Sequence, residues 1–406
     1  MNTLYKFNDV SLTGNEPNFQ SYLSKFHNNK QRPLCMCTST GIEMYIAKIN
    51  DLYVLKKMPK SGNDHFPTCI SFNAPIELSG LAEVKGQAIN DNFEDGTTTL
   101  KLDFSLSKRP GKPIPQSDGK ESSSVKTDGK KLTLKGLLHY LIDESKINYF
   151  DPSSKNKNWF YIRHALLEAT SSKITKRMNL NDSVYIPETF ILDRKDEIIN
   201  RREKKLKINL GDDNNLTKLI LIGIVKEISE SRFDFKMVVK HCPDIQFFIN
   251  KDLHRRIYKN FKEEIELWGA HENSQLVTIS TFYKTTAGIY HLEEVSFVLF
   301  NEQWIPYENI YEFKLIQKMI SENHSFTKCL RYNMDKKTPL ASLVCLDSLP
   351  TPTAMYIIPP TESQIFMDCV QNLIEESKYE GWIWDVETSM PNLPSKNEIN
   401  TEETNE

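Results

Sequence analysis

Four side chains that can bind a transition metal lie near the N-terminus, and they constrain the fold more than any other feature of the sequence. Cys35 and Cys37 form a Cys-x-Cys pair, and His65 and Cys69 form a His-x3-Cys pair. Zinc prefers tetrahedral sites of this kind, made of cysteine sulfur and histidine nitrogen. The two pairs therefore predict a zinc site. The zinc would be structural, because four protein ligands leave no position open for water or substrate.

A β-hairpin is predicted between the two pairs of ligands. Residues 43–49 and 52–58 have β-type patterns, and Asn50-Asp51 between them is typical of a tight turn. A small hairpin buries little apolar surface, so a bound metal would supply much of its stability. The alternative is three ordinary buried thiols and a surface histidine. The other cysteines occur in apolar contexts and are predicted to be small core residues: Cys242, Cys329, Cys345 and Cys369.

The cysteine count and the lack of targeting signals predict a cytoplasmic protein. Seven cysteines in 406 residues is an odd number at low density, which favours free thiols in a reducing compartment. The N-terminus lacks the regions of a secretory signal, and no apolar run approaches the ~18 residues that span a bilayer. We therefore expect no membrane contact. The net charge of −3 excludes a globally basic nucleic-acid binder, so any such binding must come from a local patch.

The length of the chain predicts several domains, at roughly 100–200 residues each. The clearest boundary is residues 107–131, where almost no apolar side chain is present to offset the entropy of ordering. The pattern as a whole predicts an α+β multidomain chain. Its predicted parts are a zinc-hairpin module (1–106), a disordered linker (107–131), a helical segment (132–210), a β-rich OB-like domain (211–304), a C-terminal α/β unit (305–394) and a disordered acidic tail (395–406).

The helical segment has two interpretations. Two or three helices with a short strand are compatible with a winged-helix module, in which Lys173, Lys176 and Arg177 would face DNA. A plain helical packing unit is the simpler interpretation. Residues 193–210 form a further predicted helix whose alternating charges are typical of a solvated face.

The middle of the chain has the element order of an OB-fold. Three β-type runs follow residue 216, then a helix over 252–268 with Asp252 as its N-cap, then two strands around Ala287-Gly288. OB barrels commonly bind single-stranded nucleic acid, with aromatic rings stacking on bases and Lys or Arg following the phosphates. The alternative is that these aromatic residues are half-buried in another β-rich domain. The residues predicted to contact nucleic acid are Arg232, Phe233, Phe235, Lys240, Tyr283, Lys284 and Tyr290, with Phe282 on the same exposed face.

Residues 308–386 have the helix, three strands, helix and strand order of the PD-(D/E)xK nuclease core. That core holds magnesium through an Asp on the second strand and a Glu-x-Lys on the third. Asp347 lies at the second strand, but the third reads AMYIIPP and has neither an acid nor a lysine. We therefore expect a degenerate nuclease core. Because the chain also lacks a Walker loop, a GxSxG elbow and an HExxH motif, no intact catalytic motif is found.

Several sequence segments spread along the chain give it a full-length resemblance to a known family. They include PLCMCTSTGIEMYIAK, HFPTC, TTTLKLDFSLSK, WIPYENIYE and FTKCLRYN. The chain resembles uncharacterised bacterial proteins carried by integrative and conjugative elements, a family marked by three N-terminal cysteines. Here these would be Cys35, Cys37 and Cys69, whereas His65 is our inference from ligand chemistry. The resemblance implies a mobile-element context and contact with DNA.

These observations lead to one predicted function and two alternatives. We expect a zinc-containing, nucleic-acid-associated protein of a bacterial mobile element that binds single-stranded DNA. The first alternative is a nuclease-like enzyme with an atypical or inactive site. The second is a protein–protein adaptor for other mobile-element proteins that act in conjugation or replication.

Overall fold

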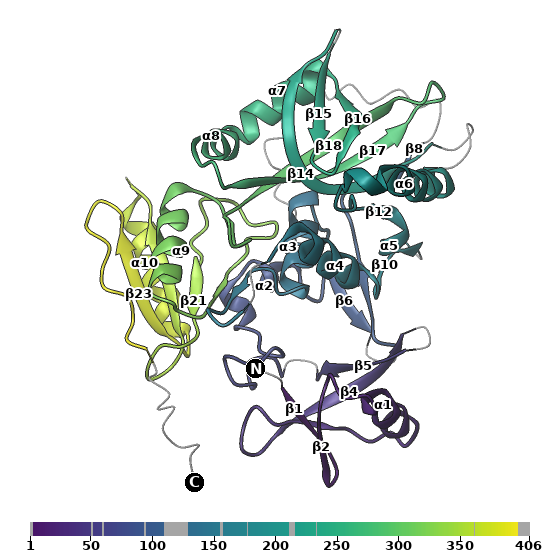
Figure 1. The fold of residues 1–406 in the computed structure, drawn as a ribbon. Coiled ribbons are helices and arrows are strands. Elements are labelled where there is room, and N and C mark those ends of the chain that lie inside the picture. The colour runs from purple at the N-terminus through teal and green to yellow at the C-terminus, as the bar shows by residue number, and fades with distance from the viewer. Residues whose placement is uncertain are drawn as a thin grey trace.

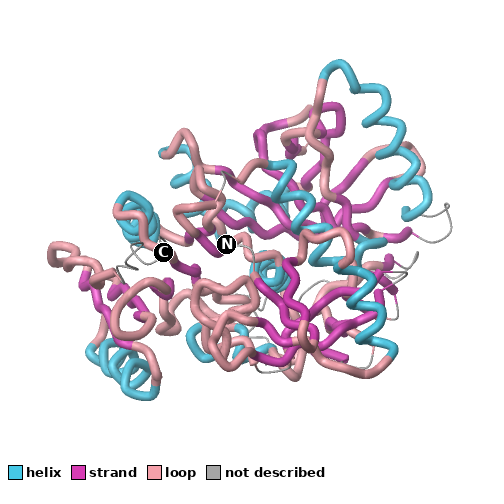
Figure 2. The backbone as a smooth tube through the Cα atoms, turned by 60° about the horizontal axis from the view of Figure 1, so that its bottom comes forward, coloured by secondary structure: helices cyan, strands magenta, loops and turns pink. Residues whose placement is uncertain are grey.

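The computed structural model describes residues 3–49, 52–58, 61–92, 95–108, 129–154, 157–176, 178–210, 216–232, 234–360 and 362–396. Over these residues the protein is a mixed α+β chain with ten α-helices and several β-sheets (Figure 1). Figure 2 shows helices, strands and loops interspersed along the whole molecule. None of the helices in these ranges is both long enough and apolar enough to cross a bilayer.

An N-terminal unit contains the predicted hairpin. β4 and β5 pair antiparallel, as predicted, in a sheet of order β2-β1-β3-β4-β5. The amphipathic helix α1 packs on this sheet, because Leu23 and Phe26 fall on one helical face and meet Phe7. The unit therefore has a small core of its own. Its elements are β1 (Leu4–Phe7), β2 (Val10–Thr13), α1 (Phe19–Asn28), β3 (Leu34–Cys35), β4 (Ile42–Ile49) and β5 (Leu52–Lys57).

A second sheet joins residues from both sides of the predicted linker. β7 pairs in parallel with β10, and the order is β11-β10-β7-β6. Apolar side chains of α3 and α4 share a large core with this sheet. The elements are η1 (Ile76–Leu78), α2 (Leu81–Val84), β6 (Ile89–Asn92), β7 (Thr97–Leu100), α3 (Leu134–Glu144), α4 (Trp159–Thr170), β10 (Lys173–Thr175), β11 (Met178–Asn179) and α5 (Leu180–Ser183). Most of the predicted linker and acidic tail lies outside the described residues, and the predicted domain boundaries stay predictions.

The middle of the chain forms a closed barrel. β14, β15 and β16 pair antiparallel in that order, β16 pairs in parallel with β18, and β17 joins β18 back to β14. Short strands β12 and β19 extend the sheet, and β8 pairs with β13. The elements are β8 (Ser107–Lys108), β12 (Val184–Tyr185), η2 (Leu192–Arg194), α6 (Lys195–Leu210), β13 (Leu216–Thr217), β14 (Leu219–Glu230), β15 (Phe235–Val239), β16 (Cys242–Ile249), α7 (Lys251–Asn260), α8 (Lys262–Ala270), β17 (Gln275–Lys284), β18 (Tyr290–Phe300) and β19 (Pro306–Tyr307).

The single helix expected over 252–268 is two helices, α7 and α8, and its N-cap is not Asp252. The side chain of Asn250 caps α7 instead, accepting a hydrogen bond of 2.8 Å from the backbone N–H of Leu253. The chain leaves the helical conformation at Phe261, whose φ is −124°. The ring of Phe261 packs edge-on against Phe297 of β18, 5.2 Å away. Tertiary packing of this ring therefore accompanies the break in the helix.

The C-terminal unit has three layers. Its sheet has the order β23-β22-β21-β20-β9, in which β22 and β23 are parallel and the other pairs antiparallel. One face shares a core with α9 and the barrel, and α10 packs on the other (Figure 1). The elements are β9 (Tyr149–Phe150), α9 (Ile310–Ser321), β20 (Phe326–Lys328), β21 (Leu343–Cys345), β22 (Thr353–Ile358), α10 (Gln364–Glu376) and β23 (Glu380–Asp385).

A buried histidine joins α3 to the C-terminal unit. His139 is 2% exposed, and its Nδ1 accepts a hydrogen bond of 3.0 Å from the backbone N–H of Tyr332. Burial, followed by the nearby charge of Lys135, lowers the pKa of His139 to about 3. The imidazole is therefore neutral in the folded protein at ordinary pH.

This histidine predicts acid sensitivity. Between about pH 6.5 and about pH 3 the unfolded chain binds a proton at His139 that the folded chain does not, so the free energy of unfolding falls as the pH falls. His139→Asn keeps an acceptor and removes the titration. Urea unfolding at a series of pH values should show an acid limb shallower by up to about 1.4 kcal/mol per pH unit. His164→Asn, at an exposed position of α4, is the control, and identical acid limbs in wild type and His139→Asn would contradict the prediction.

Candidate metal centre

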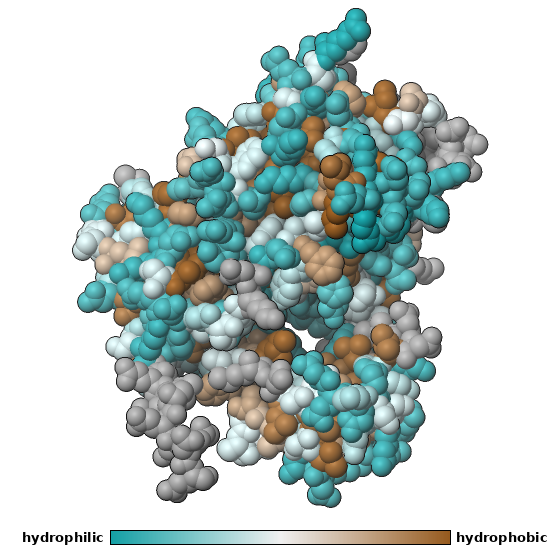
Figure 3. Space-filling model, in the orientation of Figure 1, coloured by the Kyte–Doolittle hydropathy of each residue, from teal (hydrophilic) through white to brown (hydrophobic). Residues whose placement is uncertain are grey.

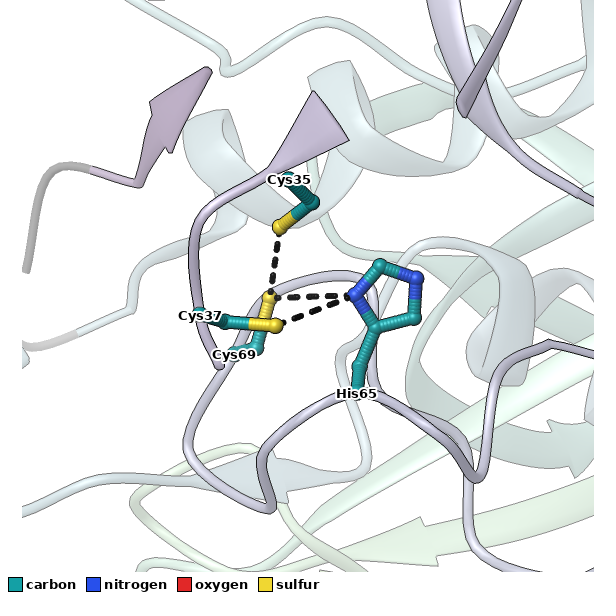
Figure 4. A group of neighbouring side chains, drawn as sticks. All are labelled: Cys35, Cys37, His65 and Cys69. Atoms are coloured by element: carbon teal, nitrogen blue, oxygen red, sulfur yellow. Dashed lines mark hydrogen bonds between the residues drawn. The ribbon is translucent and has the colours of Figure 1, made fainter. Parts of the chain in front are cut away.

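The four predicted ligands lie together. The ligand atoms of Cys35, Cys37, His65 and Cys69 are all within 4.8 Å of one another, and they point toward a common centre (Figure 4). Cys35 ends β3, Cys37 follows it, and His65 and Cys69 come from the loop after β5. The hairpin therefore brings the two pairs together as expected from their spacing. Cys35 and His65 are buried, whereas the other two thiols are half-buried.

The separations match those of a tetrahedral site. Bonds of about 2.3 Å to sulfur and about 2.0 Å to nitrogen place neighbouring sulfur atoms about 3.8 Å apart, and sulfur and nitrogen about 3.6 Å apart. Cys35 Sγ and Cys69 Sγ are 3.7 Å apart, and His65 Nδ1 lies 3.8 Å from Cys69 Sγ and 3.3 Å from Cys37 Sγ. These four residues could hold a metal ion with little movement.

Backbone N–H groups and neighbouring thiols favour negative charge at the centre. The N–H of Phe66 donates to Cys37 Sγ and that of Ser71 donates to Cys69 Sγ, each at 3.4 Å. The hydrogen bond from the Cys35 thiol lowers the pKa of Cys69 to about 4. That same contact, together with burial, raises the pKa of Cys35. These contacts favour the thiolate at Cys69, which is the form in which cysteine binds a metal.

The two ligand pairs belong to different parts of the molecule. Cys35 and Cys37 belong to the N-terminal unit, whereas Cys69 packs with Phe72 against the core under α10. The loop that carries Cys69 is fixed further by Lys146, whose Nζ donates to the backbone oxygen of Phe72 at 2.9 Å. Figure 3 shows a hollow between the N-terminal unit at the bottom and the rest of the molecule. A metal ion would therefore join two separate cores.

The chain matches one family over most of its length. The family described as "Protein of unknown function (DUF1173)" matches residues 5–387. The chain belongs to this family. A search of curated proteins and a search of solved structures each found no match. The family description assigns no role to any residue of this chain.

Of the other cysteines, three agree with the sequence prediction and one does not. Cys242, Cys329 and Cys345 are buried. Cys369 is exposed on α10, so its prediction as a core residue was wrong. An apolar sequence context did not indicate burial here, because α10 also leaves the apolar side chains of Ile365 and Met367 exposed.

The residues predicted to contact nucleic acid are only partly gathered. Arg232 is exposed in the loop that follows β14, Lys284 is exposed at the end of β17, and Tyr283 before it is half-buried. Phe235 and Tyr290 pack their rings against the barrel core, and the ring of Phe235 stacks on His254 of α7. Phe233 lies outside the described residues.

Two further residues of this prediction lie away from the barrel's exposed face. Lys240 is in the turn between β15 and β16, at the other end of those strands, where its Nζ donates to Gln275 at 2.8 Å. Phe282 is fully buried, so its placement on the exposed face was wrong. Of the winged-helix residues, Lys173 is buried and ion-paired with Glu144 at 2.5 Å, so it does not face solvent as that interpretation requires. Arg177 lies outside the described residues.

The sequence pattern did not predict an outward-facing row of side chains on the barrel. Lys236 is the register partner of Phe248, Phe248 of His291, and His291 of Tyr283, so one row crosses four strands. We call these four residues the barrel row. The ring of His291 lies 5.6 Å from that of Tyr283, nearly parallel to it, and 6.0 Å from that of Phe248. Most of their strand neighbours are buried on the inner side, as the two-residue period requires: Met237, Phe247, Ile249, Phe282 and Leu292.

The metal centre predicts a measurable link between metal and proteolysis. Cys37→Ser removes one ligand and should abolish the metal bound by this cluster. Because the ion would join two cores, limited proteolysis between the N-terminal unit and the remaining chain should become at least about tenfold faster. Elemental analysis and timed trypsin digestion measure the two effects. Cys369→Ser, at an exposed thiol, is the control, and a Cys37→Ser protein with wild-type metal content would contradict the assignment.

Proposed function

We propose that this protein binds single-stranded DNA on its barrel and that zinc at the Cys35, Cys37, His65 and Cys69 centre has a structural role. Three thiolates and an imidazole are the soft, closed ligand set that structural zinc prefers. The zinc therefore stabilises the chain and leaves the binding to other residues. The observation that carries the proposal is the barrel row, described above.

The barrel is best described as an OB-fold. In chain order its strands pair as first, second, third, fifth, fourth and back to the first, with the third and fifth parallel. Two helices, α7 and α8, lie between the third and fourth strands. OB-folds bind oligonucleotides on the face of the second and third strands and on the loops after the first and fourth. Here those loops are residues 231–234 and 285–289.

The barrel row has the chemistry that single strands require. Phe248, His291 and Tyr283 offer a continuous series of flat rings on which bases can stack, and stacking tolerates any base sequence. Lys236 ends the row on one side, and the Nζ of exposed Lys284 lies 5.4 Å from the ring centroid of Tyr290, the strand neighbour of His291. Aromatic rings flanked by cations suit unpaired bases joined by phosphates. In duplex DNA the bases are stacked on one another and unavailable.

The helix beside this face adds positive charge. α7 carries Lys251, Arg255 and Lys259 at exposed positions, and its His254 stacks on Phe235 at the start of the second strand. Asp252, whose carboxylate pairs with Arg255 at 2.8 Å, is the acidic residue of this helix. A local basic surface of this kind can attract phosphates even though the net charge of the whole chain is −3.

We also infer that the C-terminal unit is a nuclease-type core without a magnesium site. Its helix, three antiparallel strands, helix and parallel strand follow the order of that fold. Its third strand, β22, is entirely buried and has no acidic residue or lysine, and Asp347 after the second contacts a histidine and a thiol. Such a core supports a role in DNA binding or assembly over cleavage. The mobile-element context and its other proteins as partners remain proposals that rest on the sequence resemblance.

Fluorescence anisotropy with labelled oligonucleotides tests the binding. The zinc-loaded protein should prefer single strands to duplex, and its affinity should fall steeply with salt because phosphate contacts release counterions. Phe248→Ala and Tyr283→Ala should each weaken binding about 5- to 150-fold, which corresponds to about 1–3 kcal/mol per stacked base.

A matched control uses another exposed ring. Phe160 on α4 is 69% exposed and far from the barrel row in sequence and in fold, so Phe160→Ala should bind like the wild type. Equal losses in all three variants would indicate a general effect on folding. No binding of single strands at low salt would refute the proposal and favour the adaptor alternative.

A further inference from the structure

A second cluster of metal-binding side chains lies in the C-terminal unit. His324 Nδ1, Cys345 Sγ and an oxygen of Asp347 are all within 4.8 Å of one another. The Nδ1 atom lies 2.9 Å from Asp347 Oδ1 and 3.5 Å from Cys345 Sγ, and the sulfur lies 3.2 Å from the same oxygen. Among the described residues, only this group and the N-terminal centre bring three or more such ligands together.

Strand pairing holds these three residues in place. Phe326 of β20 is the register partner of Cys345 of β21, so the residues before β20 lie beside those after β21. The backbone N–H of Ser325 donates to Asp347 Oδ2 at 2.8 Å, and that of His324 donates to the oxygen of Met319 at 2.9 Å. The ligand atoms therefore sit on a fixed backbone at the junction of α9 and β20.

The arrangement does not suit nucleophilic catalysis. In a Cys-His-Asp triad the thiol contacts one ring nitrogen of the histidine and the carboxylate orients it through the other. Here Cys345 and Asp347 both contact Nδ1 of His324. The imidazole cannot accept a proton from the thiol at the atom that already donates to the carboxylate. A shared position for a cation explains the convergence of all three ligands on one point.

We propose that His324, Cys345 and Asp347 form a second transition-metal site, with zinc as the expected ion. For a tetrahedral ion the bond lengths to nitrogen, oxygen and sulfur place these atoms about 3.3–3.6 Å apart. The observed separations are at most about 0.4 Å shorter, so small side-chain rotations suffice. Magnesium and calcium do not fit, because they require oxygen ligands.

The site differs from the N-terminal centre in having an open position. Three protein ligands plus water or substrate is the arrangement of reactive zinc sites, whereas four protein ligands is that of structural ones. The side chain of His324 is 3% exposed and that of Asp347 is 19% exposed, so access is from the side of the carboxylate. A water molecule or a small anion would complete the coordination there. The proposal is independent of DNA binding by the barrel.

Counting metal ions tests the site. The full-length protein, loaded with excess zinc and freed of unbound metal by gel filtration, should contain about two zinc ions per chain by mass spectrometry. His324→Gln and Cys345→Ala should each bind one fewer ion than the wild type. The control is Cys329→Ala, which removes a buried thiol of the same unit that belongs to neither cluster, and it should bind as many ions as the wild type.

Cobalt provides a second readout that does not depend on the C-terminal variants being stable. The intensity of thiolate-to-cobalt charge-transfer absorption rises with the number of thiolates bound to the ion. Cobalt at the N-terminal centre should therefore give the intensity of three thiolates, and cobalt at the second site that of one. Cobalt-loaded Cys37→Ser should keep a tetrahedral spectrum with the weaker charge transfer. Two results overturn the proposal: His324→Gln that binds as many zinc ions as the wild type, or a wild-type protein whose bound metal is all accounted for by the N-terminal centre.

Discussion

The arrangement of the whole molecule depends on β14, the long strand that closes the barrel. Its first half pairs with β17 and its second half with β15, so one strand belongs to both sides of the barrel. Ile220 points outward into the core shared with α3 and α4, and Leu221 points inward. Gly223 leaves room for Val239 to pack against the strand, because a Cβ there would lie 2.5 Å from Val239 Cγ1. β14 therefore both closes the barrel and contributes side chains to the core that the barrel shares with the helices.

This closure decides which surface is left for a ligand. The helices cover the outer side of β14, β17 and β18 where those strands meet the large core, and the outer side of β15 and β16 lacks that cover. The barrel row crosses the uncovered side and continues onto the ends of β17 and β18. Its rings are half-buried, and those of Tyr283 and His291 are stacked on each other. The packing of the helices on β14, β17 and β18 thus decides which side of the barrel stays open for the proposed binding of single strands.

The two metal clusters act at different levels of the structure. Cys35 lies in the sheet of the N-terminal unit and Cys69 packs against the core under α10, so an ion at the N-terminal centre contributes to the arrangement of the units. His324 and Cys345 belong to one unit that already has a hydrogen-bonded backbone and two apolar faces. An ion there would add little to the fold, and its open position gives it a chemical role instead. The two roles differ because the N-terminal centre has four ligands from two parts of the molecule, whereas the second site has three ligands within one unit.

The sequence by itself determined the features that depend on local spacing. The cluster of Cys35, Cys37, His65 and Cys69, the hairpin between its two pairs and the strand order of the middle and C-terminal parts were predicted, because ligand pairs and two- or 3.6-residue periods are local. Which aromatic residues face outward was not: Phe248 and His291 were missed, and Phe282 was placed on the wrong side. A bulge at Glu293 of β18 and the pairing of distant strands set that choice, since a shift of one residue moves a side chain to the other face. The second cluster likewise needed the pairing of β20 with β21, because nothing near His324 in the sequence indicates Asp347.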